Sequence, residues 1–240
     1  MRLSYDLHIH SCLSPCGDDD MTPANIVGMA ALKGLDVIAV TDHNSCKNCP
    51  AVLHFADRYG LVAVPGMELC TSEEIHALCL FPELKQAMEF DAYVYDRLIR
   101  FPNKEEIFGK QQIYNMEDEI QDRVPWLLIN SADISFQGLW ELVMCCKGVM
   151  IPAHLDRTAN SLISNLGAIP PDSCFPTAEL RHMEKLEKMK EAHPYLEQCR
   201  IITNSDAHYL ENINEPVNFL EAEERTAEAV VRALLEREKK

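Results

Sequence analysis

Residues 3–10 read Leu-Ser-Tyr-Asp-Leu-His-Ile-His, a strand-like run that ends in a His-x-His pair. Alternate side chains of a strand point to the same side, so His8 and His10 face one way. A loop rich in Ser, Pro, Cys, Gly and Asp follows, and then Thr22 and Pro23 stand where a helix N-cap and first-turn proline are expected. The stretch predicts a strand, a polar loop and a helix.

The alternation of strands and helices continues to the end of the chain. Further strands are predicted at 36–41, 61–67, 75–81, 149–154 and 200–205, and helices at 23–33, 50–59, 83–100, 116–123, 138–146, 181–192 and 226–237. This pattern favours an α/β fold with a parallel sheet that closes into a barrel. Residues 82–125 form a polar, mainly helical excursion, and no linker divides the single domain predicted over residues 1–240.

Composition narrows the class of protein. Hydrophobic residues make up 47% and charged residues 25%, which is typical of a globular chain. No apolar run approaches the roughly 20 residues that cross a bilayer, and the charged N-terminus does not resemble a signal peptide. We therefore expect a cytoplasmic protein with reduced cysteines and no membrane partner. The net charge of -16 argues against duplex nucleic acid as a partner, because duplex binding requires many basic side chains.

Histidines and carboxylates gather at the predicted strands. They are His8, His10, His43, Glu68, His76, His154, Asp206 and His208. Strand C-termini of a parallel barrel open onto one face, so these side chains are expected to converge there. Imidazole and carboxylate groups bind Zn, Mn and Fe. A single histidine after a strand is more often structural, but the whole set predicts a metal site.

Five short segments occur in an order that matches a known family. They are Asp-Leu-His-Ile-His-Ser at 6–11, Thr-Asp-His at 41–43, Gly-Met-Glu at 66–68, Pro-Ala-His at 152–154 and Ser-Asp-Ala-His at 205–208. With them the chain resembles the polymerase and histidinol phosphatase (PHP) family. The resemblance implies a distorted (β/α)7 barrel that hydrolyses phosphate esters with two or three divalent metal ions, Zn, Mn or Fe.

The resemblance also implies a role for each residue of the set. One metal would be held by His8, His10, Glu68 and Asp206, and a second by Glu68, His76 and His154, with Glu68 shared. A third would use His43, His208 and an acidic residue of the first loop. Asp18 is expected in that position because its distance to Pro23 matches the family spacing, and Asp19 or Asp20 are the alternatives.

The predicted chemistry is attack by a metal-activated water on a phosphate ester. Two metals about 3.5–4 Å apart can activate the water and stabilise charge on the attacking and leaving oxygens. Glu68 and Asp206 are the expected catalytic carboxylates. Arg157, just after His154, is expected to be catalytic as well and to bind substrate by clamping phosphate oxygens. An ordinary surface ion pair with Asp156 explains Arg157 equally well.

Four cysteines form a weaker pattern. Cys12 and Cys16 lie in the first loop, and Cys46 and Cys49 lie in the loop after the second strand. Four thiolates in neighbouring loops could bind a structural zinc. Small buried cysteines are common, and this is the favoured interpretation.

The predicted substrate is a small phosphorylated metabolite or nucleotide, or a short oligonucleotide end, as a monoester or a diester. An amidohydrolase-type metal hydrolase is one alternative, but the final Asp-x-His, the shared Glu68 and Arg157 favour phosphate esters. A non-catalytic metal-binding module is the other. The full set of ligands favours activity over this last alternative.

Overall fold

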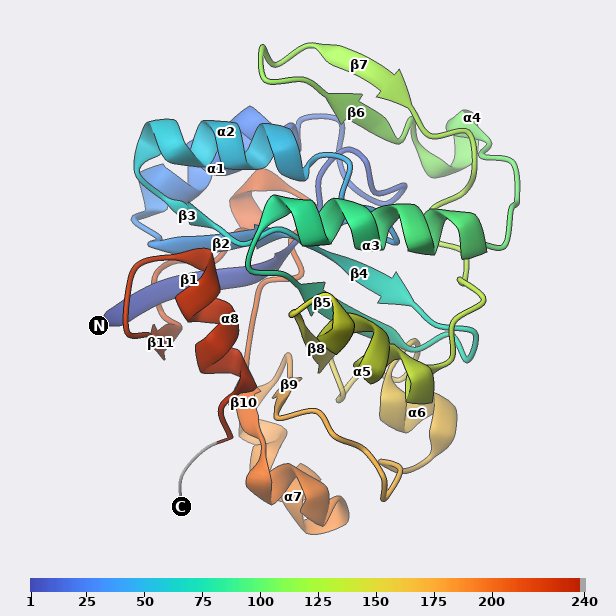
Figure 1. The fold of residues 1–240 in the computed structure, drawn as a ribbon, viewed down its shortest axis with the longest axis vertical. Coiled ribbons are helices and arrows are strands. Elements are labelled where there is room, and N and C mark those ends of the chain that lie inside the picture. The colour runs from blue at the N-terminus through green and yellow to red at the C-terminus, as the bar shows by residue number, and fades with distance from the viewer. Residues whose placement is uncertain (238–240) are drawn as a thin grey trace.

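Four short sheets carry the strands, and helices pack on their outer faces (Figure 1). The computed structural model describes residues 1–237. Its strands are β1 (Arg2–Ile9), β2 (Val37–Val40), β3 (Val62–Ala63), β4 (Gly66–Cys70), β5 (His76–Leu80), β6 (Gln112–Tyr114), β7 (Ile120–Arg123), β8 (Val149–Pro152), β9 (Thr177–Glu179), β10 (Arg200–Ile202) and β11 (Phe219–Glu221). The mixed α/β class predicted from the sequence is confirmed.

Helices connect most of these strands. They are α1 (Pro23–Lys33), α2 (Cys49–Tyr59), α3 (Leu84–Arg97), α4 (Glu105–Phe108), α5 (Phe136–Cys145), α6 (Leu162–Leu166), α7 (Leu186–Ala192) and α8 (Ala227–Leu235), with 3-10 turns η1 (Met183–Lys185), η2 (Pro194–Gln198) and η3 (Leu210–Asn212). The first helix begins as predicted, because the Thr22 side chain accepts from Asn25 N at 3.3 Å. It ends at Gly34, whose φ of 80° suits glycine. Within the described residues, none of the helices is both long and apolar enough to span a membrane.

The first sheet has the strand order β11-β1-β2-β3, and its central strands β1 and β2 are buried on both faces. Strands β1, β2 and β3 are parallel, and β11 is antiparallel to β1. Alternate side chains of β2 enter different cores: Ile38 packs in one cluster with Val27 of α1, and Val37 packs in another with Val230 of α8. Helices cover both faces of the sheet in Figure 1, and both faces are apolar for this reason.

The second sheet corrects the expectation of parallel strands throughout. In the order β4-β5-β8, both pairs are antiparallel. Only residues 71–75 join β4 to β5, which is too short for the crossover that parallel strands require. His76 begins β5, within the strand predicted at 75–81, and it pairs with Cys70 at the end of β4. This edge of the sheet is the one that carries the candidate site.

Isolated links connect the sheets to one another. A parallel bridge joins His43 to Glu68, a second joins Ile9 to Ala207, and Leu155 N donates to Glu179 O at 2.9 Å between the ends of β8 and β9. They link the end of β2 to β4, the end of β1 to the segment after β10, and the end of β8 to β9. The regular pairings of the described residues nevertheless form separate sheets, so the closed (β/α)7 barrel stays a prediction.

Residues 82–125 are only partly helical. Helix α3 agrees with the prediction, but the helix predicted at 116–123 is wrong, because β6 and β7 form a hairpin there. The Asn115 side chain accepts from Glu117 N at 3.0 Å and from Glu119 N at 2.8 Å, and Asp118 has a φ of 62°. These local contacts form a turn that competes with a helix. The hairpin stands apart from the sheets at the top of Figure 1.

Gly66 is expected to be essential to the packing of β4. A Cβ at this position would lie 2.5 Å from Cys79 O and 2.7 Å from Leu80 Cδ2. Gly66→Ala should lower the free energy of unfolding by about 1–3 kcal/mol through overpacking. Gly28→Ala is the matched control, because nothing lies within 4 Å of its added Cβ and a helix interior favours alanine by about 0.5–1 kcal/mol. Urea unfolding of both variants and of the wild type measures these changes. A Gly66→Ala variant as stable as the wild type would contradict the close approach of β4 and β5.

Candidate metal centre

The carboxylate of Glu68 lies at the centre of a buried histidine cluster. The residue is 1% exposed, in the middle of β4. Five imidazole nitrogens lie within 3.4 Å of one of its two oxygens: His8 Nε2, His10 Nε2, His43 Nδ1, His76 Nδ1 and His154 Nε2. The shortest of these distances, from His76 Nδ1 to Glu68 Oε1, is 2.9 Å. The histidines predicted from separate strands thus converge on one carboxylate.

Asp206 supplies a second carboxylate beside the first strand. Its Oδ1 lies 3.5 Å from His8 Nε2 and 3.4 Å from His10 Nε2. The backbone of Asp206 has a φ of 53°, and that of His154 has a φ of 33°. These left-handed conformations are uncommon outside glycine and cluster at functional sites. The buried carboxylate of Asp6 anchors this segment, because its Oδ1 accepts from Ser205 N at 3.0 Å.

The two histidines of the first strand present the same ring atom to the cluster. Both Nδ1 atoms have partners elsewhere: His8 Nδ1 lies 3.1 Å from both oxygens of Glu179, and His10 Nδ1 lies 2.9 Å from Ser14 Oγ. With hydrogens on Nδ1, the Nε2 lone pairs of the two rings face each other at 3.1 Å. Such an arrangement is repulsive unless a proton or a metal cation lies between the two Nε2 atoms. Two Nε2 donors beside the carboxylates of Glu68 and Asp206 fit a divalent metal.

Glu179 is the residue of this centre that the sequence analysis missed. It ends the short strand β9, is 2% exposed and accepts from three groups: His8 Nδ1, His154 N at 2.8 Å and Asn204 Nδ2 at 2.7 Å. A carboxylate that accepts from the far nitrogen of a ligating histidine fixes the ring and raises its basicity. Its place in the short stretch Phe-Pro-Thr-Ala-Glu-Leu at 175–180 was the available signal, but β9 itself was not predicted.

Asp42 and Ser14 form a similar support for His10. Asp42 Oδ1 accepts from Ser14 Oγ at 2.7 Å, and Ser14 Oγ in turn accepts from His43 N at 3.1 Å. Asp42 also accepts from the backbone and side chain of Ser11 at 2.7 and 2.6 Å. The Ser14 hydroxyl thus connects the buried Asp42 carboxylate to His10 and His43.

Electrostatics within the cluster oppose the effect of burial. Burial alone would raise the pKa of Glu68, but His76, His8 and His43 outweigh it and hold that pKa well below its usual range. Burial would lower the pKa of His76, yet the charge of Glu68 raises it to about 10. His10 behaves differently: burial and His43 lower its pKa to about 3. Glu68 is therefore ionised and His10 is neutral. A metal ligand must be deprotonated, so metal binding would release a proton from His76.

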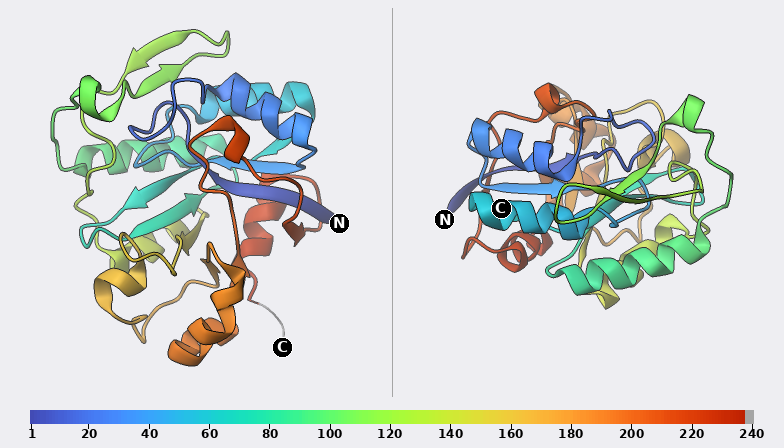
Figure 2. Two further views of the ribbon diagram at one scale, coloured as in Figure 1. Left: turned by 180° about the vertical axis from the view of Figure 1, so that it is seen from behind. Right: turned by 90° about the horizontal axis from the view of Figure 1, so that it is seen from above.

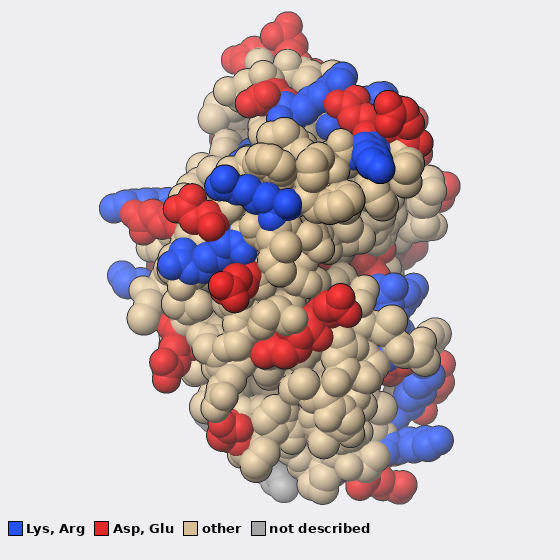
Figure 3. Space-filling model, turned by 90° about the vertical axis from the view of Figure 1, so that its right-hand side faces the viewer, with Lys and Arg blue, Asp and Glu red and all other residues tan. Residues whose placement is uncertain are grey.

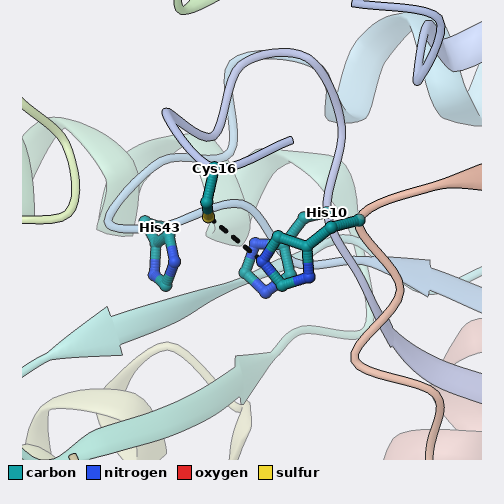
Figure 4. A group of neighbouring side chains, drawn as sticks. His10, Cys16 and His43 are labelled. Atoms are coloured by element: carbon teal, nitrogen blue, oxygen red, sulfur yellow. Dashed lines mark hydrogen bonds between the residues drawn. The ribbon is translucent and has the colours of Figure 1, made fainter. Parts of the chain in front are cut away.

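Six of the predicted ligands, together with Cys16, fall into three overlapping groups of donor atoms, whereas His154 and Asp206 belong to none of these three. Within each group the donor atoms lie no more than 4.8 Å apart: His8, His10 and Glu68; His43, Glu68 and His76; and His10, Cys16, His43 and His208. Figure 4 shows Cys16 directed toward the histidines of the third group. Within residues 1–237, no such group contains Asp18. Its Oδ1 instead accepts from Asp20 N at 2.9 Å, and Asp19 pairs with Lys110.

The other three cysteines of the proposed zinc cluster lie elsewhere. Cys12, Cys46 and Cys49 are buried, and the latter two pack in the apolar cluster with Met67 and Leu69. Across the part of the chain that the structure describes, none of the three belongs to a group of metal-compatible donors. The arrangement agrees with the favoured interpretation, in which they are core residues.

A cleft of about 420 Å³ opens above the cluster. Glu68, His43 and Asp206 are among its lining residues, together with two arginines. Arg157 Nη1 lies 3.2 Å from Asp206 Oδ2, and Arg181 Nη1 lies 3.8 Å from the same atom. Asp156, the alternative partner of Arg157, instead pairs with Lys185 at 3.1 Å. Arg181 is a second arginine at the cleft, which the sequence analysis did not single out.

Comparison with known proteins identifies the family. The model of the PHP domain matches residues 6–216, which is most of the chain. The chain belongs to the PHP domain family. The resemblance inferred from the five short segments is thereby confirmed, and with it the class of metal-dependent hydrolases acting on phosphate esters.

Two relatives match parts of the sequence. The chain is 33% identical over 95 residues to the uncharacterized protein MJ1587 of Methanocaldococcus jannaschii, a match that covers 36% of this chain and 56% of that protein. It is 34% identical over 76 residues to the 5'-3' exoribonuclease Rnm of Salmonella typhimurium, covering 31% of this chain and 25% of the relative. The matches thus span about half of one relative and a quarter of the other.

Solved structures share the fold. The lesion-specific endonuclease PfuEndoQ of Pyrococcus furiosus has a TM-score of 0.67 at 20% identity, covering 98% of this chain and 56% of that one. A complex of Endonuclease Q with a 27-mer duplex substrate has a TM-score of 0.70 at 21% identity, with the same coverage. An inferred metal-dependent phosphoesterase from Bifidobacterium adolescentis has a TM-score of 0.60 at 18% identity, covering 96% of this chain and 95% of that chain. One protein of this fold thus takes a duplex, which counts against the expectation, drawn from the net charge, that duplex nucleic acid is excluded as a partner.

Glu179→Gln should weaken metal binding although Glu179 is expected to touch no metal. An amide has one acceptor oxygen, so its NH2 group would face the His8 Nδ1 or Asn204 Nδ2 donor and disturb the His8 ring. We expect affinity for Zn or Mn to fall about 10- to 100-fold. Isothermal titration of the metal-free protein measures this, with Glu191→Gln on exposed α7 as the control. Unchanged affinity would show that Glu179 does not orient the histidine.

Proposed function

We propose that the chain hydrolyses a phosphodiester of a nucleotide or of a short nucleic acid at the cleft above Glu68. One observation carries the proposal: a buried carboxylate shared by five imidazoles lies at the base of an open cleft lined by two arginines. Carboxylate and imidazole donors suit catalytic divalent metals, and guanidinium groups suit phosphate oxygens. The combination fits a phosphate ester better than a neutral amide.

Residues of this centre would hold two metals around Glu68. His8, His10, Glu68 and Asp206 would form the first site, and Glu68, His76 and His154 the second. When bound, such ions supply Lewis acidity toward phosphate oxygens and lower the pKa of a water molecule. Glu68 would belong to both sites, because histidines of both sets lie within 3.4 Å of its oxygens.

The arginines would position the substrate. The side chains of Arg157 and Arg181 are 38% and 44% exposed at the cleft, so both can turn from Asp206 toward an entering phosphate. A guanidinium binds phosphate oxygens with two parallel hydrogen bonds, which fixes the orientation of the ester. Two such groups would also offset the negative charge of a diester as it approaches the acidic centre.

The choice of a nucleotide or short nucleic acid as substrate is supported by the activities of similar proteins and by the charge of this chain. The relatives named above include an exoribonuclease and an endonuclease, both of which cleave phosphodiesters. On the face in Figure 3, acidic and basic side chains are intermixed and form no continuous basic stripe. With a net charge of -16, a long polymer would find little general attraction, so recognition would depend on the cleft itself.

Glu68→Gln tests the catalytic centre. The change removes the shared charge, so metal content should fall and kcat/KM for bis-p-nitrophenyl phosphate should drop by more than about 100-fold. Elemental analysis and Mn-, Zn- or Fe-supplemented assays measure both effects, and Glu117→Gln in the exposed β6–β7 turn is the control. Full metal-dependent activity of the variant would contradict the proposal.

Arg157→Ala and Arg181→Ala test substrate binding. Each should raise KM about 10-fold with a smaller change in kcat, because the lost interaction is with the phosphate already present in the ground state. Arg58→Ala on the exposed end of α2 is the matched control. Comparing a nitrophenyl monoester with a diester in each variant also shows which ester the cleft prefers. Unchanged KM in both variants would place these arginines outside the substrate site.

A further inference from the structure

We propose that Cys16 is a thiolate ligand of the third metal site, together with His43 and His208, in the position for which Asp18 is the sequence-based candidate. The inference rests on the proposed function and specifies the chemistry of one of its metal sites. The thiolate would make the third site a softer donor set than the two sites around Glu68, which contain only nitrogen and oxygen donors.

The sulfur and the imidazoles converge in the structure. Cys16 Sγ lies 3.1 Å from His208 Nε2. The far nitrogen of that ring, Nδ1, lies 2.8 Å from the carbonyl oxygen of Asp206 and donates to it, so the Nε2 lone pair faces the sulfur. His43 and His10 complete the group of donor atoms within 4.8 Å of one another. Figure 4 shows the sulfur directed toward the rings, with a dashed line to its imidazole partner.

The first loop is folded so that Cys16, and not Asp18, reaches the centre. Ser14 N donates to Ser11 O at 3.0 Å, and Gly17 N donates to Ser14 O at 2.9 Å, which makes two successive tight turns. A Cβ on Gly17 would lie 2.2 Å from Ser11 O, so only glycine allows this approach. Asp18 N then donates to His208 O at 3.0 Å, which fixes the loop beside the segment that follows β10. The Asp18 carboxylate is left in contact with Asp20 N.

A cysteine at this position changes which metals the site prefers. Thiolate and imidazole donors favour Zn, Co(II) and Fe(II), whereas Mn and Mg prefer oxygen. On binding, the Cys16 thiol transfers its proton to solvent, and the thiolate bonds to the cation. The third site would therefore retain a thiophilic metal under conditions in which the two sites around Glu68 accept Mn. Cys16 is exposed at the mouth of the cleft, so a cation can reach it from solvent.

Cobalt titration of the metal-free full-length protein tests the assignment. A thiolate bound to Co(II) gives a charge-transfer band in the near ultraviolet, whereas imidazole and carboxylate donors give only weaker visible bands. We expect the wild type to develop the charge-transfer band to saturation at one equivalent. Cys16→Ser and Cys16→Asp should both lose it. Cys16→Asp should keep the wild-type metal stoichiometry, because it restores an anionic donor, while Cys16→Ser binds one metal fewer per chain.

Cys174→Ser is the control, because Cys174 is also exposed but lies in another cleft, beside Asp172 and Phe175. It should leave the band unchanged. Visible cobalt bands without a charge-transfer band in the wild type, or a band that survives in Cys16→Ser, would overturn the assignment and leave the proposed function intact. Failure of the wild type to bind any cobalt, zinc or manganese would instead overturn the proposed function and this assignment together.

Discussion

The interaction on which the site depends is the burial of the Glu68 charge. An ionised carboxylate removed from water loses several kcal/mol of solvation unless other groups compensate. Here the compensation comes from five imidazoles on four separate segments of the chain, each of which must be brought to the same point. The ends of the sheets are therefore fixed relative to one another by one side chain. A divalent cation would supply the remaining positive charge.

Around this centre, a second set of polar groups determines where the histidines point. Glu179 holds His8, and the Asp42 and Ser14 pair holds His10, so the atoms facing the cleft are predetermined. Left-handed backbone at His154 and Asp206 costs on the order of 1–3 kcal/mol each. Hydrogen bonds from His154 N to Glu179 and from Ser205 N to Asp6 hold these segments in place. The site is thus stabilised against strain by buried carboxylates that do not line the cleft.

The sequence predicted the histidine cluster well because its signal is local: each histidine or carboxylate follows or belongs to a recognisable apolar run. Helix α1, with its Thr22 cap, was predicted to the residue for a similar reason. Antiparallel pairing of β4, β5 and β8 depends on a short connection that the alternating pattern obscured. A helix was predicted at the position of the β6–β7 hairpin because the composition of that stretch is helical. The turn contacts of Asn115 and the positive φ of Asp118 determine the hairpin instead. Glu179 and the direction of Cys16 depend on tertiary contacts across more than 150 residues, which no local pattern encodes.

The β4–β5 hairpin has a consequence for the order in which this protein folds. Glu68 and His76 meet across a turn of five residues, a contact that a hairpin can form within microseconds. Leu7 and Asn204, which join β1 to the segment after β10, are separated by 197 residues and must close most of the chain. Contacts of such long range form slowly. The Glu68 and His76 part of the metal centre would thus form early in the nascent protein. The contact of His8 with Asp206 would form only after the C-terminal third has been synthesised. The complete centre would therefore bind metal only when the fold is complete.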